Sequence, residues 1–117
     1  MGTEVSFFVE GAVKPGRLDD VRAVMDELVE STTAEPGALG YAWSLSEDAT
    51  VLHLMERYVD SAAALAHLET FGSRFAGRYF DAVEPTRFVV YGGDDSVAEA
   101  LAAAQPLLMG PLVGLTR

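Results

Sequence analysis

Apolar residues recur with two different periods along the chain, and the order of these periods constrains the fold more than any other feature. Alternating runs rich in β-branched and aromatic residues predict strands, whereas spacings of three and four residues predict amphipathic helices. We expect strands over Val5–Val13, Leu39–Leu45, Thr50–Tyr58 and Thr86–Tyr91. We expect helices over Arg17 to about Thr33, Ser61 to about Glu69, Phe71 to about Ala82, and Asp94 or Asp95 to about Gln105.

The resulting order is β-α-β-β-α-β with an added C-terminal helix and tail, which predicts a ferredoxin-like α+β fold. In such a fold, a split β-α-β antiparallel sheet carries its helices on one face. We expect one domain over residues 1–117, with its core at about 3–92 and the C-terminal helix and tail at 93–117. A chain of 117 residues is long enough to bury a core without disulfides or metals.

Both faces of the predicted sheet carry apolar side chains. In the third strand, for example, Leu52 and Leu54 point to one face, while Val51 and Met55 point to the other. An antiparallel sheet with one face in water should instead alternate apolar and polar residues. Because the helices can cover only one face, we expect a second copy of the chain to cover the other face in a two-fold homodimer.

Charge and composition exclude several classes of function. The net charge is −10 and Lys14 is the only lysine, so the chain would repel phosphates and we expect no nucleic-acid partner. There is no cysteine for disulfides, and the two histidines cannot supply the three or four ligands of a metal site. We find neither a membrane-length apolar run nor a recognisable signal peptide, so we expect a cytoplasmic protein with no membrane partner.

Polar side chains gather around one strand-to-helix joint, in the segment Leu52–Leu68. Glu56 and Tyr58 lie on one strand face, and His67 follows in an Ala-rich helix. An imidazole titrates in the range that suits removal of a phenolic proton, and Glu56 would orient it or raise its basicity. His67 and Glu56 are therefore the candidate catalytic residues. The alternative interpretation is a structural hydrogen bond that holds the helix to the sheet.

Aromatic side chains supply candidate walls for a ligand pocket. Trp43 lies on a predicted strand, and Phe71, Phe75 and Tyr79 are spaced by four residues, which places them on one helical stripe. Together with Tyr58, these residues are the candidates for binding a small apolar aromatic ligand. Core packing is the alternative interpretation, because buried aromatic residues are common.

Four segments carry a resemblance to a known family. They are the first strand with its following Lys14-Pro15-Gly16 turn and helix, EPGALGYAW at Glu35–Trp43, ERYVDSAAALAHL at Glu56–Leu68, and the closing strand. The third segment has a Glu, an aromatic residue two positions later, an acidic turn and a helical His-Leu pair. The chain resembles the antibiotic biosynthesis monooxygenase domain family of dimeric α+β barrels, from about Val5 to Tyr91.

This resemblance implies cofactor-independent oxidation of a quinol or polyphenol, in an apolar pocket between the helices and the sheet. Some relatives instead degrade haem with an Asn, a Trp and a His. This chain contains no Asn, and His67 and Gly77 fall near the positions of that Trp and His, so we do not expect haem degradation. Two alternatives stay open: a ligand-binding or stress-related dimer without chemistry, and an oxygen-independent isomerase or cyclase.

Overall fold

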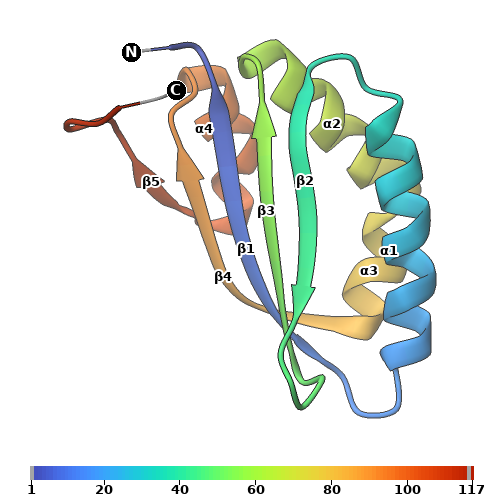
Figure 1. Ribbon diagram of the computed structural model, residues 1–117. Coiled ribbons are helices and arrows are strands. Elements are labelled where there is room, and N and C mark those ends of the chain that lie inside the picture. Colours follow the sequence, from blue (N-terminus) through green and yellow to red (C-terminus); the bar gives the residue numbers. More distant parts are fainter. Residues whose placement is uncertain (1, 116) are drawn as a thin grey trace.

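The computed structural model describes residues 2–115 and Arg117, and its elements follow the predicted order (Figure 1). The strands are β1 (Val5–Val13), β2 (Ala38–Leu45), β3 (Val51–Tyr58), β4 (Val83–Tyr91) and β5 (Leu107–Met109). The helices are α1 (Leu18–Thr33), α2 (Ser61–Arg74), α3 (Ala76–Ala82), α4 (Asp95–Leu101) and the 3-10 helix η1 (Ala102–Ala104).

One five-stranded sheet organises the fold, with the strand order β2-β3-β1-β4-β5. The first four strands pair antiparallel, and β5 adds a short parallel pairing at the β4 edge. The helices lie on one face of this sheet (Figure 1). The ferredoxin-like α+β class predicted from the element order is confirmed by this topology.

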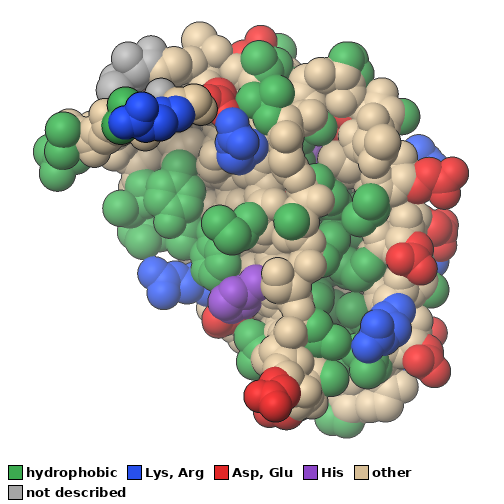
Figure 2. Space-filling model, in the orientation of Figure 1, with side chains coloured by type: hydrophobic (Ala, Val, Ile, Leu, Met, Phe, Trp, Pro, Cys, Tyr) green, Lys and Arg blue, Asp and Glu red, His purple; other side chains and the backbone are tan. Residues whose placement is uncertain are grey.

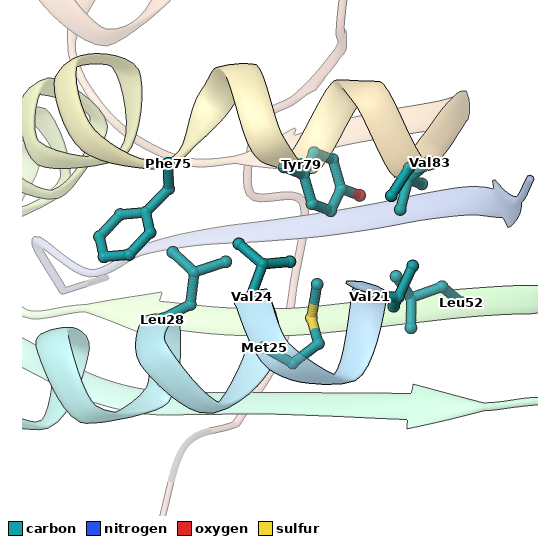
Figure 3. Packing of buried hydrophobic residues seen from close by; sticks show 9 residues of the cluster. Val21, Val24, Met25, Leu28, Leu52, Phe75, Tyr79 and Val83 are labelled. Atoms are coloured by element: carbon teal, nitrogen blue, oxygen red, sulfur yellow. The ribbon is translucent and has the colours of Figure 1, made fainter. Parts of the chain in front are cut away.

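The helix-covered face buries two separate apolar clusters. The first joins α1 to α3 and to the sheet, and its members include Val24, Leu28 and Tyr79 (Figure 3). The second lies toward α2 and α4, and includes Phe7, Val97 and Leu101. Helix α1 contributes to the first cluster because its apolar residues recur every three to four positions along one face.

Strand β4 begins earlier than predicted, at Val83, and so includes Pro85. Proline has no N–H for a ladder and is tolerated on edge strands. Pro85 satisfies this rule because β5 pairs with β4 only from Val89 onward. Opposite Pro85, the β1 register shifts between Glu10 and Gly11, where a Cβ on Gly11 would lie 2.4 Å from a Val83 methyl carbon. The bulge therefore needs glycine.

The C-terminal part differs most from the sequence prediction. Helix α4 ends at Leu101, and a turn of 3-10 helix follows to Ala104, where Gln105 takes a left-handed conformation with φ of 51°. The next residues, predicted as a broken tail, form strand β5. Helix α2 also runs past its predicted end, to Arg74.

The opposite face of the sheet is not covered by a helix. Met55 and Tyr91 are 68% and 46% exposed there, and hydrophobic side chains gather over the front of the sheet in Figure 2. His53 lies on this face and pairs with Glu10 at 2.9 Å. The predicted homodimer, which would cover this face, stays a prediction. None of the helices in the described residues is long and apolar enough to cross a membrane.

Packing of α1 against the sheet predicts that replacing two valines of that helix with alanine changes the free energy of unfolding by very different amounts. Val24 is 1% exposed and Val29 is 41% exposed. We expect Val24→Ala to lower the free energy of unfolding by about 2 kcal/mol, because it removes two buried methyl groups and leaves a cavity. Val29→Ala should change it by less than about 0.5 kcal/mol. Urea denaturation measures both, and equal losses would contradict this packing.

Candidate active site

A cavity of about 510 Å³ lies between the helix-covered face of the sheet and helices α2, α3 and α4. Residues of both apolar clusters line it, so it occupies the space between them. Its size falls within the usual range for small-molecule sites. The lining residues are mostly apolar, and they include Phe7, Tyr41, Trp43, Leu54, Glu56, His67, Leu68, Phe71, Tyr79, Phe80, Phe88 and Leu101.

Strand alternation places the polar groups of this cavity. In β3, the residues Leu52, Leu54, Glu56 and Tyr58 are all buried on the helix-covered side, while the residues between them are more exposed. Asp60 then starts α2, because its side chain accepts a hydrogen bond from the backbone N–H of Ala63 at 2.8 Å. Of the two buried residues of α2, Ala64 and His67, it is His67 that faces Glu56.

His67 is 4% exposed and is held by a carboxylate from another part of the chain. Its Nδ1 lies 3.1 and 3.2 Å from the two carboxylate oxygens of Glu35, just after helix α1. A carboxylate only accepts, so Nδ1 carries a proton and donates it to Glu35. In the neutral imidazole, Nε2 is then the acceptor. The Glu35 pairing thus fixes the tautomer and turns the basic nitrogen toward the inside of the site.

Glu56 faces this basic nitrogen from the sheet. Its Oε1 lies 3.5 Å from Nε2 of His67, and Tyr58 donates a hydrogen bond to the same oxygen. Glu56 is 5% exposed, and burial raises the pKa of its carboxyl from 4.5 to about 8, with a further rise from the charge of Glu35. The bond from Tyr58 opposes this rise but does not cancel it. At neutral pH, the Glu56 carboxyl therefore keeps its proton.

The same burial acts on His67 in the opposite direction. It lowers the pKa of the imidazole, and the nearby Glu35 carboxylate only partly restores that pKa. At neutral pH, the cavity thus presents an uncharged imidazole that can accept a proton beside a carboxylic acid that can donate one. This is an acid–base pair in which the same apolar surroundings move the two pKa values in opposite directions, and each shift favours the uncharged form.

Aromatic rings form the cavity wall around this pair. Tyr41 packs against His67 and Trp43, with ring centroids 5.4 and 5.9 Å apart. Tyr79 packs against Trp43 and Phe71, at 5.8 and 5.7 Å. The Tyr79 hydroxyl and the Trp43 indole N–H are buried and have no hydrogen-bond partner among the described residues. Both side chains line the cavity, and their polar atoms are covered by neighbouring protein atoms.

Two residues predicted to bind a ligand do not line the cavity. Tyr58 is fully buried behind Glu56 and acts on it through the hydrogen bond. Phe75 packs in the first apolar cluster with the residues of α1 (Figure 3). The regular four-residue stripe assumed for it is interrupted, because α2 ends at Arg74 and α3 starts at Ala76. Trp43, Phe71 and Tyr79, by contrast, line the cavity together with His67 and Glu56.

Glu35 and Tyr41 are site residues that the sequence interpretation missed. The sequence pattern predicts Glu35 only as part of the Glu35-Pro36-Gly37 helix stop, and it assigns the orientation of the histidine to Glu56. The available signal was its place at the start of the EPGALGYAW segment. Tyr41 shares strand parity with Trp43, so that parity was the signal for its place in the wall.

The second histidine takes no part in this site. His53 lies on the opposite face of the sheet, as its strand parity predicts, and its partner there is Glu10. Among the described residues, no group of three or more His, Asp or Glu side chains is arranged to hold a metal ion.

Fold and site together define a class of small α+β proteins that enclose an apolar ligand cavity between a ferredoxin-like sheet and its helices. The sequence profile of one such family, antibiotic biosynthesis monooxygenase, matches residues 8–77, which is more than half of the chain. The chain therefore belongs to the antibiotic biosynthesis monooxygenase family, as its sequence segments indicated. No curated protein matches the sequence.

Solved structures share the fold. MupZ from Pseudomonas fluorescens is 23% identical with a TM-score of 0.90, over 100% of this chain and 91% of that chain. A putative antibiotic biosynthesis monooxygenase from Nitrosomonas europaea is 26% identical with a TM-score of 0.64, over 80% and 92%. SnoaB, a cofactor-independent oxygenase from Streptomyces nogalater, is 15% identical with a TM-score of 0.67, over 76% and 91%.

The raised pKa of Glu56 predicts an unusual pH dependence of stability. Between pH 4.5 and about 8, the folded chain holds a proton that the unfolded chain has released, so stability falls as the pH rises through this window. Glu56→Gln keeps an acceptor for Tyr58 but cannot ionise. We compare the free energy of unfolding of this variant with that of the wild type at each pH. The difference should shift in favour of the variant by on the order of 3 kcal/mol between pH 5 and pH 8.

Urea denaturation at the two pH values measures this gain, and Glu10→Gln is the matched control. The pKa of Glu10 is lowered, chiefly by its hydrogen bond with His53, so its ionised form favours the folded state. Its replacement should therefore bring no gain at the higher pH. If the difference in free energy of unfolding between Glu56→Gln and the wild type is the same at pH 5 and pH 8, Glu56 is not protonated in the folded chain.

Proposed function

We propose that this protein is a cofactor-independent monooxygenase that acts on a small electron-rich aromatic substrate, a quinol or polyphenol, in the cavity beneath α2 and α3. The observation that carries this proposal is the His67–Glu56 pair inside an aromatic wall, with the tautomer of His67 fixed by Glu35. Membership of the antibiotic biosynthesis monooxygenase family supports the same reaction class.

Proton removal is the first step of the proposed reaction. A phenolic substrate gives its O–H proton to Nε2 of His67, and the imidazolium that forms is stabilised by the Glu35 carboxylate 3.1 Å from Nδ1. The protonated Glu56 carboxyl can donate a hydrogen bond to the phenolate oxygen. Charge that develops on the substrate is thus met by a positioned donor in a site of low polarity.

Dioxygen is the oxidant in the second step. Removal of the proton leaves an electron-rich ring that can pass electrons to dioxygen, and the new carbon–oxygen bond forms at a ring carbon ortho or para to the phenolate oxygen that carries one hydrogen. This hydrogen and the proton taken up by His67 are the two hydrogens that leave in water. Cleavage of the oxygen–oxygen bond then leaves a carbonyl on that carbon and releases one water. The substrate supplies all four electrons, so this scheme requires no added reductant, metal or flavin.

A second candidate is an oxygen-independent isomerase or cyclase. The protonated state of Glu56 favours it specifically, because a buried carboxylic acid beside a neutral imidazole can donate and accept protons at two points of one ligand. Ligand binding without chemistry is the third possibility, in which the same pair holds α2 to the sheet. The three differ in what they require of oxygen and of His67.

Oxygen uptake with a panel of quinols and anthrone-like phenols tests the proposal. We expect His67→Gln to lower the rate by about 10²- to 10⁴-fold, the usual contribution of a general base. His53→Gln is the matched control, since it removes the other histidine on the opposite sheet face. Circular dichroism checks that both variants fold.

Other outcomes would point elsewhere. Substrate turnover that continues under nitrogen would replace the oxygenase with the isomerase or cyclase. Substrate binding with no turnover under air would favour the binding role. Uptake that survives in His67→Gln would remove His67 from the mechanism.

A homodimer through the uncovered sheet face completes the proposal. Its support is the exposure of Met55, Tyr91, Leu107 and Met109 on or beside that face, an apolar surface that water solvates poorly. The helices of each chain lie on the other face of the sheet, so they leave this face free to contact a second chain. A copy of the same face is self-complementary in the way that two-fold interfaces require.

Sedimentation equilibrium tests this assembly, with an expected mass of about twice 12.5 kDa. We expect Met55→Arg to shift the wild-type dimer toward monomer by at least tenfold in dissociation constant, because it places a charge in the apolar interface. Val29→Arg, on the exposed side of α1, should leave the assembly unchanged. A wild-type monomer at micromolar concentration would refute the dimer.

A further inference from the structure

The C-terminal segment supplies one side of the ligand cavity. Ala100, Leu101 and Ala104, from α4 and η1, line it opposite the residues of α2 and α3. This segment lies outside residues 8–77, the part of the chain that the family profile matches. It is therefore an addition to the portion of the fold that carries His67 and Glu56.

Buried side chains anchor this segment to the sheet. Val97 is 1% exposed and Leu101 9%, and both pack in the second apolar cluster with Phe7 and Val90. Asp94 begins the helix by accepting a hydrogen bond from the backbone N–H of Ser96 at 3.0 Å. The segment is thus packed as part of the core.

The exposure of the lining residues locates the cavity entrance. Glu56, His67, Leu54 and Phe7 are all 5% exposed or less, and they form the closed end. The exposed lining residues mark where the cavity opens to solvent: Gly72, Phe80, Pro85, Arg87, Ala100 and Ala104. Helix α4 and η1 therefore form one lip of the entrance, and α3 forms the other through Phe80.

The cavity is longer than a single ring requires. Its floor is supplied by four adjacent strands, β2, β3, β1 and β4, and three strand spacings amount to about 14 Å. The acid–base pair lies under α2 at the closed end of the cavity, and the C-terminal lip lies at the entrance. Between them the lining is aromatic or aliphatic.

We infer that the C-terminal lip selects ligands by length, and that the ligand is an elongated molecule with a proton-donating ring at one end and an apolar extension at the other. The ring lies at His67 and Glu56, and the extension passes Ala100 and Ala104 at the entrance. This inference rests on the proposed function, because it assumes that the cavity binds a phenolic substrate.

The small side chains at the entrance support this assignment. Ala100 and Ala104 each present only a methyl group to the passage, and a Cβ added at Gly72 would meet no atom within 4 Å. Larger residues at these positions would narrow the passage without touching the acid–base pair. Ala103, in the same turn of η1, is exposed and does not line the cavity. The same Ala→Phe substitution at this position is therefore a matched control.

A series of para-alkylphenols with methyl, propyl, pentyl and heptyl chains tests the inference through binding alone. Fluorescence of Trp43, the single tryptophan and a cavity residue, gives the dissociation constants. In the wild type, each added methylene should tighten binding by about fourfold, as expected for burial of an apolar group. Ala104→Phe and Ala100→Phe should abolish this gain for the longer chains and leave methylphenol affinity unchanged. Ala103→Phe should retain the whole gain.

The outcomes separate this inference from the proposed function. If phenols bind the wild type but affinity does not depend on chain length, or depends on it equally in Ala104→Phe and Ala103→Phe, the lip does not select by length and the inference fails alone. If no phenol of the series binds, the cavity is not a phenol site, and both the proposed function and the inference fail. Circular dichroism confirms that each variant is folded before binding is measured.

Discussion

The burial of one carboxyl group, that of Glu56, sets the protonation state of the candidate site. An ionised carboxylate without a counter-cation is costly in an apolar interior, and the cost is avoided when the group keeps its proton. The surrounding groups fit this state: Tyr58 donates a hydrogen bond to Glu56, and no cation lies against it among the described side-chain contacts. His67, buried by the same walls, is held neutral for the same physical reason. A donor and an acceptor thus coexist at one pH because one apolar environment moves their pKa values in opposite directions.

Glu35 connects this buried pair with the surface. Its side chain is 21% exposed, compared with 5% for His67, and it also borders an open surface hollow beside α1 and the end of α2. A proton that arrives at Nε2 of His67 can therefore leave from Nδ1 to Glu35 and on to water. The imidazole thus connects the ligand cavity on its Nε2 side, through Glu35, with a surface hollow on its Nδ1 side.

Much of the fold could be predicted because it depends on local periodicity. The element order and the inward parity of Leu54, Glu56 and Tyr58 follow from alternation in the strand. The features that could not be predicted depend on contacts between segments that are far apart in the sequence. Strand β5 has only three residues and exists because the open edge of β4 offers a partner, which no local pattern encodes. Glu35 follows a helix end and meets His67, 32 positions later, only once α1 and α2 pack on one sheet. Phe75, at the junction of α2 and α3, packs in the first apolar cluster and is not among the residues that line the cavity.

The candidate site divides in the same way between what the sequence encodes locally and what packing creates. His67 and Glu56 lie at one strand-to-helix joint, so their proximity follows from local geometry and does not by itself distinguish a structural bond from an acid–base pair. The distinction comes from what surrounds them. A purely structural pair gains nothing from a cavity of about 510 Å³ next to it, since unfilled space in a core costs dispersion energy. A chain that keeps this space, and leaves the buried polar atoms of Trp43 and Tyr79 without partners among the described residues, is less stable than one with a filled core. Occupation by a ligand that fills the space recovers the lost dispersion energy, and it does so next to the buried His67–Glu56 pair.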